Sequence, residues 1–157
     1  PTMEKRDKVV SLINDLIEIN NDRIVGYEKA IDELKDDISD LRMLFQRYIQ
    51  ESRQYKQELV HEVKRLGGNP ADGTTNSGKI YRVWMDLKSV VTGHDRKTVL
   101  ENCEFGEDAA QKAYDMALNN ELELETSLRD LLVRQKTQLR VGHDEVKKLR
   151  NLENVNA

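Results

Sequence analysis

The chain of 157 residues is poor in cysteine, proline and aromatic side chains. Its single cysteine, Cys103, excludes an internal disulfide and fits a reducing, cytoplasmic compartment. Two prolines and an aromatic content of 5% favour helices over a β-sandwich or barrel. No apolar run approaches the roughly 20 residues that span a bilayer, so we expect no membrane partner.

Charged residues make up 34% of the chain and hydrophobic residues 38%, which suits one folded domain over residues 1–157. The formal net charge is −4, and acids and bases are interspersed. Since no basic face or tail stands out, we expect no nucleic-acid partner. Cys103 lies at the spacing of a core residue, which predicts a buried, unreactive thiol.

Apolar residues recur with helical spacing in four long segments. We expect helices over residues 3–35, 39–66, 95–119 and 123–152. Ser39 is the expected N-cap of the second helix, and Gly67 and Gly68 are its expected end. A shorter amphipathic stripe at 80–91 follows a polar loop. The expected fold is therefore all-α, a four-helix bundle of two helical hairpins with a long crossover that carries a short extra helix.

The two predicted hairpins match each other when Tyr27 is placed on Tyr114. This single shift brings the apolar positions of both helices into register. It places Leu12 on Val99, Ile13 on Leu100, Leu41 on Leu128, Phe45 on Leu132 and Leu59 on Val146. Any two amphipathic helices match at some offset, but agreement of two helix pairs at one offset favours a duplicated unit.

Polar side chains interrupt the apolar face of each helix. Glu107 lies among core positions of the third helix, where a carboxylate is costly unless it is paired. Its match in the first helix is Asn20, and Glu51 in the second helix matches Gln138 in the fourth. His143 also falls on the inner face of the fourth helix. These five residues are the candidate site.

Two kinds of site suit these residues. Carboxylate, amide oxygen and imidazole ligands suit one Fe, Mn or Zn ion. The alternative is a metal-free polar network in which Glu51 and Glu107 bond to Tyr27, Tyr114, Gln138 and His143. The remaining histidines, His61 and His94, are expected to face solvent.

Several stretches resemble a bacterial ferritin-like family of unknown function. They read GY at 26–27, ESRQYKQEL at 51–59, ELVHEVKRLGG at 58–68, WMDLK at 84–88, EFGED at 104–108 and GHD at 142–144. The resemblance implies a ferritin-like bundle, whose di-iron members take Glu from two helices and Glu-x-x-His from the other two. Here the first glutamate would fall at Asn20, Gln54 replaces the second-helix histidine, and Arg140 stands three residues before His143.

Three functions therefore remain open. The first is binding of a single metal through Glu51, Glu107 and His143, and the second is a non-catalytic structural or interaction bundle. The third is an oxidase or peroxidase with an iron pair, against which the missing ligands argue, and we assign no catalytic residue. The crossover stripe at 80–91, which includes Trp84, would either cover the bundle or form a homodimer contact.

Overall fold

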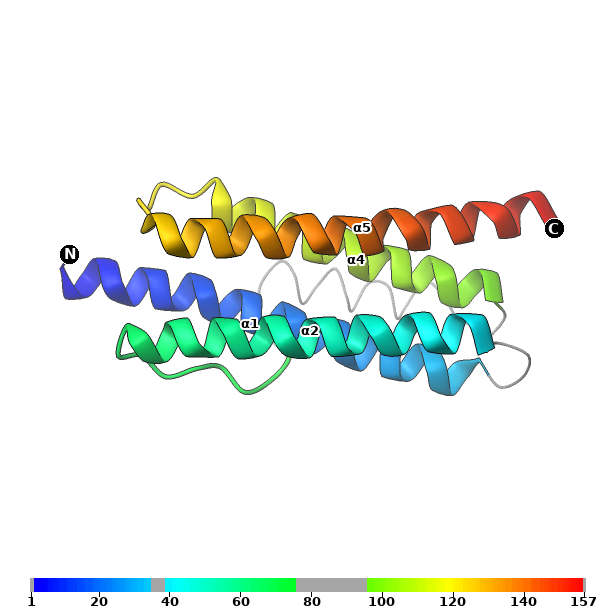
Figure 1. Ribbon diagram of the computed structural model, residues 1–157, viewed down its shortest axis with the longest axis horizontal. Coiled ribbons are helices and arrows are strands. Elements are labelled where there is room, and N and C mark those ends of the chain that lie inside the picture. The colour runs from blue at the N-terminus through cyan, green and yellow to red at the C-terminus, as the bar shows by residue number, and fades with distance from the viewer. Residues whose placement is uncertain (1, 35–38, 76–95, 157) are drawn as a thin grey trace.

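The computed structural model describes residues 2–34, 39–75 and 96–156. Its helices are α1 (Met3–Glu33), α2 (Ser39–Arg65), α4 (Arg96–Leu118) and α5 (Thr126–Asn156). α1 and α2 form one antiparallel hairpin, and α4 and α5 form a second hairpin beside it (Figure 1). The predicted all-α bundle of two hairpins is confirmed, whereas the short helix expected at 80–91 lies outside the described residues.

Local sequence explains where α1 begins and where α2 ends. The hydroxyl of Thr2 accepts a hydrogen bond from the backbone N–H of Lys5 (3.1 Å), which caps the start of α1. At the end of α2, Gly67 has a φ of 80°, a conformation that glycine adopts without strain. The N–H of Gly68 then donates to the carbonyl of Val63 (2.9 Å), as in a Schellman cap. The predicted end of the second helix is thus confirmed.

The polar segment 69–75 runs back along α1. The side chain of Asn14 donates to the carbonyl of Asn69 (3.0 Å), and Asn21, two turns further along α1, donates to the carbonyl of Gly73 (2.8 Å). These bonds provide partners for backbone groups that have no strand or helix of their own. The segment therefore covers one side of α1.

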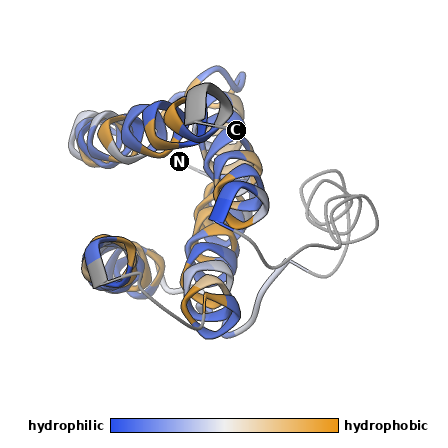
Figure 2. Cartoon of the chain, turned by 90° about the vertical axis from the view of Figure 1, so that its right-hand side faces the viewer, coloured by the Kyte–Doolittle hydropathy of each residue, from blue (hydrophilic) through white to orange (hydrophobic). Residues whose placement is uncertain are grey.

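Two apolar clusters fill the bundle, one toward each end. The first joins the N-terminal half of α1 and the C-terminal half of α2 to the C-terminal half of α4 and the N-terminal half of α5. The second joins the opposite halves and includes Cys103, which confirms that this cysteine is buried. The hairpins meet mainly through α1 and α4, while α2 and α5 contact each other little, as the end-on view indicates (Figure 2).

Several apolar and aromatic residues that match between the hairpins are buried to the same extent. Ile13 and Leu100 are both fully buried, as are Phe45 and Leu132. Tyr27 and Tyr114, which set the register, are 3% and 0% exposed. The internal repeat read from the sequence therefore corresponds to equivalent positions in the two hairpins. Within the described residues, no helix is both long and apolar enough to cross a membrane.

Candidate functional site

Arg23 of α1 is the centre of a polar layer between the two apolar clusters, and it is 1% exposed. Its guanidinium makes two hydrogen bonds to Glu107 of α4, from Nε to Oε1 (2.5 Å) and from Nη2 to Oε2 (3.3 Å). Its Nη1 donates to Glu51 Oε1 and Ser52 Oγ, both at 3.0 Å, and to the carbonyl of Tyr48 (3.3 Å) on α2. One side chain therefore joins α1 to both α2 and α4.

The fourth helix approaches the same cluster at Gly142. A Cβ atom at this position would lie 3.0 Å from Nη2 of Arg23 and 3.0 Å from Oε2 of Glu107. The guanidinium also lies 5.5 Å from the ring centre of Tyr27 and 5.0 Å from that of Tyr48, within the range of cation–π attraction. Because Gly142 has no side chain, α5 leaves room for the ion pair of Arg23 and Glu107.

The charges in this Arg23 cluster balance only in part. Burial pulls the pKa of Arg23 down, but Glu107 and Glu51 outweigh burial, so this pKa lies above its ordinary value and the guanidinium stays charged. Burial, together with the nearby charge of Glu107, raises the pKa of Glu51 although Arg23 acts to lower it. The pKa of Tyr27 also lies well above its ordinary value, first because of burial and then because of Glu107. One cation therefore faces two carboxylates, one of which ionises less readily than usual.

A second network surrounds the Tyr114 hydroxyl, whose own partners are amides, and it ends at Glu58. Asn20 donates from Nδ2 to the Tyr114 hydroxyl and to the carbonyl of Leu16, both at 2.9 Å. The hydroxyl donates to Gln135 Oε1 (2.7 Å), and Gln135 Nε2 donates to Glu58 Oε1 (3.0 Å). Burial raises the pKa of Tyr114, so the phenol stays protonated and can donate.

The two networks occupy equivalent positions in the two halves of the bundle. In the register that places Tyr27 on Tyr114, Asn20 matches Glu107. Each tyrosine therefore faces a polar residue from the other hairpin, an acid near Tyr27 and an amide at Tyr114. The two matched positions therefore differ in charge: Glu107 belongs to an ion pair, and Asn20 bonds to a tyrosine hydroxyl.

His143 belongs to a third cluster at the edge of the polar layer. Its Nε2 lies 2.5 Å from Asp108 of α4, and its Nδ1 lies 3.0 Å from Asp144, which also accepts a hydrogen bond from Arg140 (3.1 Å). Burial lowers the pKa of His143, but its hydrogen bonds to the carboxylates of Asp144 and Asp108, together with their charges, outweigh burial and leave this pKa above its ordinary value. The imidazolium form therefore links α4 to α5.

The structure brings some of the predicted site residues together and separates others. Glu51 and Glu107 share one guanidinium, while Asn20 and His143 belong to the other two clusters. Gln138 is exposed, so the prediction that it faces inward is wrong. His61 is exposed as predicted, and His94 lies outside the described residues.

Arg23 and Gln135 are central residues that the sequence analysis missed. Arg23 lies three residues after Asn20 and four before Tyr27, which is the spacing of the buried face of α1. Gln135 is fully buried and has the same spacing between Leu132 and Leu139. Helical spacing was therefore a usable signal, but an arginine is seldom fully buried unless it is paired.

The donor set does not fit an iron pair. Both oxygens of Glu107 accept hydrogen bonds from Arg23, and so does Oε1 of Glu51. A metal ion beside these carboxylates would also meet the positive charge of the guanidinium at short range. Within the described parts of the chain, no group of three His, Cys, Asp or Glu side chains is arranged to hold a metal ion.

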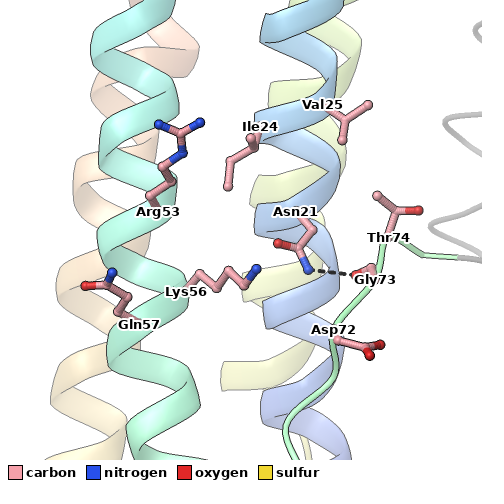
Figure 3. Close-up of a pocket in the computed structure, with 9 residues that line it drawn as sticks. All are labelled: Asn21, Ile24, Val25, Arg53, Lys56, Gln57, Asp72, Gly73 and Thr74. Carbon is pink, nitrogen blue, oxygen red and sulfur yellow. Dashed lines mark hydrogen bonds between the residues drawn. The ribbon is translucent and has the colours of Figure 1, made fainter.

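A pocket of about 460 Å³ lies elsewhere, between α1, α2 and the segment 72–74 (Figure 3). Arg53, Lys56 and Gln57 line it from α2, opposite Asn21, whose amide holds Gly73. None of the five predicted site residues lines this pocket. The candidate site is therefore the buried polar layer and not this surface hollow.

Comparison with solved structures shows the fold. A Dps1 mutant from Mycobacterium smegmatis has a TM-score of 0.79 and 13% identity, over 94% of this chain and 98% of that one. A ferritin-like, diiron-carboxylate protein from Bacillus anthracis str. Ames has a TM-score of 0.69 and 15% identity, over 96% and 99%. These likenesses confirm the predicted ferritin-like bundle.

Comparison with curated proteins finds no match. A family model does match, over residues 8–120, which include most of α1 and all of α2 and α4. The resemblance to a ferritin-like family of unknown function is therefore confirmed, and the chain belongs to the family described as Domain of unknown function (DUF2383).

Proposed function

We propose that this chain is a non-catalytic ferritin-like bundle that works as a structural or interaction protein without a metal ion. In carboxylate bundles, bound metal ions balance the charge of the buried glutamates. Here the guanidinium of Arg23 contacts Glu107 and Glu51 from within the polar layer. This buried arginine is the observation that carries the proposal.

Charge and geometry support this function over metal binding. The Arg23 and Glu107 side chains are 1% and 2% exposed and form a bidentate pair. A pair of this kind satisfies both groups by hydrogen bonds as well as by charge. A metal ion bound to Glu107 would displace the guanidinium of Arg23 from this carboxylate. The guanidinium would then be a buried cation without this carboxylate partner, which is costly.

Metal content and thermal stability test the proposal together. The full chain is purified without chelator, its metals are measured by elemental analysis, and its melting temperature is compared with and without EDTA. We expect no stoichiometric metal and the same melting temperature in both buffers. One equivalent of Fe, Mn or Zn that disappears in Glu107→Ala would instead support the single-metal site predicted from the sequence.

Binding of one metal ion, a homodimer and a cytoplasmic location stay predictions. The apolar stripe that suggested a dimer contact lies at 80–91, outside the described residues. Sedimentation equilibrium at several protein concentrations distinguishes a monomer from a dimer directly.

A further inference from the structure

We infer that the side chain of Arg23 takes the place of a divalent cation, and that Glu51, Glu107 and an imidazole at position 23 would bind a transition-metal dication. This inference rests on the proposed function. It goes further because it treats the carboxylates as a convergent cation site and not as parts of an ordinary ion pair.

The first support is the convergence of two carboxylates from different helices. Glu51 on α2 and Glu107 on α4 both point at one guanidinium, with contacts of 3.0 and 2.5 Å. Neighbouring oxygens of Ser52 and of the Tyr48 carbonyl also face Nη1. The space around the guanidinium is therefore lined by oxygen atoms, the ligands that hard and borderline cations prefer.

The second support is the charge of the cluster. Arg23 supplies one positive charge and contacts two carboxylates, those of Glu51 and Glu107. A dication would balance both carboxylates. The Glu51 side chain is 23% exposed, so one ligand of the cluster lies at the solvent boundary.

The third support is the room that a shorter side chain would leave. Nε of Arg23 is the guanidinium nitrogen closest to the α1 backbone, and it contacts Glu107. An imidazole at the same position reaches about as far along the side chain and presents a nitrogen ligand. The space of the outer guanidinium, between Glu51 and Glu107, is then free for the ion.

The test uses Arg23→His with Co²⁺ as the probe, because cobalt coordination is visible by absorption. We expect Arg23→His to bind one equivalent of Co²⁺ at least tenfold more tightly than the wild type. We also expect saturating Co²⁺ to raise its melting temperature by several degrees. Adding Glu107→Gln should abolish both effects. If Arg23→His folds only with Co²⁺ present, that result also supports the inference, since binding and folding are coupled.

Arg134→His is the matched control, because Arg134 pairs with Glu58 at 3.1 Å on the surface and its replacement also sets an imidazole beside a glutamate. Equal Co²⁺ affinity of Arg23→His and this control would overturn the inference. Failure of Arg23→His to fold in Co²⁺ would overturn it too. Neither result affects the proposed function, which fails only if the wild type holds a metal ion.

Discussion

Glu51 and Glu107 contact different nitrogens of the same guanidinium, yet their side chains are 23% and 2% exposed. The two carboxylates therefore differ in how much each depends on Arg23. Glu107 has exchanged nearly all of its contact with water for this one partner, whereas Glu51 retains part of its hydration.

Glu107→Gln should destabilise the protein far more than Glu51→Gln. Loss of one partner of a buried ion pair costs about 3–5 kcal/mol, while loss of a partly exposed charge costs about 1 kcal/mol or less. Burial raises the pKa of Glu51, so its ionised form is disfavoured in the folded state and the amide should be tolerated. Urea unfolding of both variants measures the difference. Equal losses would contradict the assignment of Arg23 to Glu107 as its main partner.

Gly142→Ala should destabilise the bundle although alanine favours helices. The new methyl group would lie 3.0 Å from Arg23 Nη2 and 3.2 Å from Cε1 of Tyr48, and the ion pair fixes the guanidinium. Overpacking costs about 1–3 kcal/mol, which exceeds or offsets the gain of about 1 kcal/mol in helix propensity. Gly73→Ala is the control, because a Cβ there meets nothing within 4 Å. A more stable Gly142→Ala would show that the cluster can shift.

His143 should stabilise the fold in acid and lose this effect in mild alkali. Its pKa in the folded state is raised above the ordinary 6.5 because its hydrogen bonds to the carboxylates of Asp144 and Asp108, together with their charges, outweigh burial. A raised histidine pKa stabilises fully below the unfolded value and is lost as pH rises through the folded value. The free energy of unfolding of wild type minus that of His143→Gln should thus fall from pH 6 to pH 9. A difference that does not vary with pH would exclude the imidazolium link.

The two equivalent tyrosines should respond differently to loss of the hydroxyl. Tyr114→Phe removes the donor to Gln135 Oε1 and one of the two acceptors of Asn20 Nδ2, and an unsatisfied buried group costs about 1–3 kcal/mol. The buried hydroxyl of Tyr27 has no hydrogen-bond partner among the described residues, so Tyr27→Phe should be neutral or stabilising. Thermal melts of the two variants compare them directly. A larger loss in Tyr27→Phe would point to a partner, such as a buried water molecule, at that hydroxyl.

The helices could be predicted from the sequence because their apolar residues repeat every three or four positions over many turns. Gly67 also fixed the end of α2, since its positive φ suits glycine alone. Glu107 and Asn20 were recognisable because each interrupts an apolar stripe and the two match across the repeat. These features depend on short-range spacing, which a single sequence contains.

The partners of those residues could not be predicted in the same way. Arg23 lies 84 residues from Glu107, and only the packing of α1 on α4 brings them together. His143 was placed on the inner face correctly, but its contact with Asp108 depends on how α5 is rotated against α4. That rotation also turns Gln138 to solvent while Gln135 stays buried.

The ion pair between Arg23 and Glu107 also determines how the two hairpins are aligned along each other. Apolar helices can slide along each other by one turn, about 5.4 Å, and still bury similar surfaces. A slide of α1 along α4 would separate Arg23 from Glu107 and leave two buried charges unpaired, at a cost of several kcal/mol. Only one alignment of the two halves avoids this cost, so a pair that adds little net stability can still select a single native arrangement.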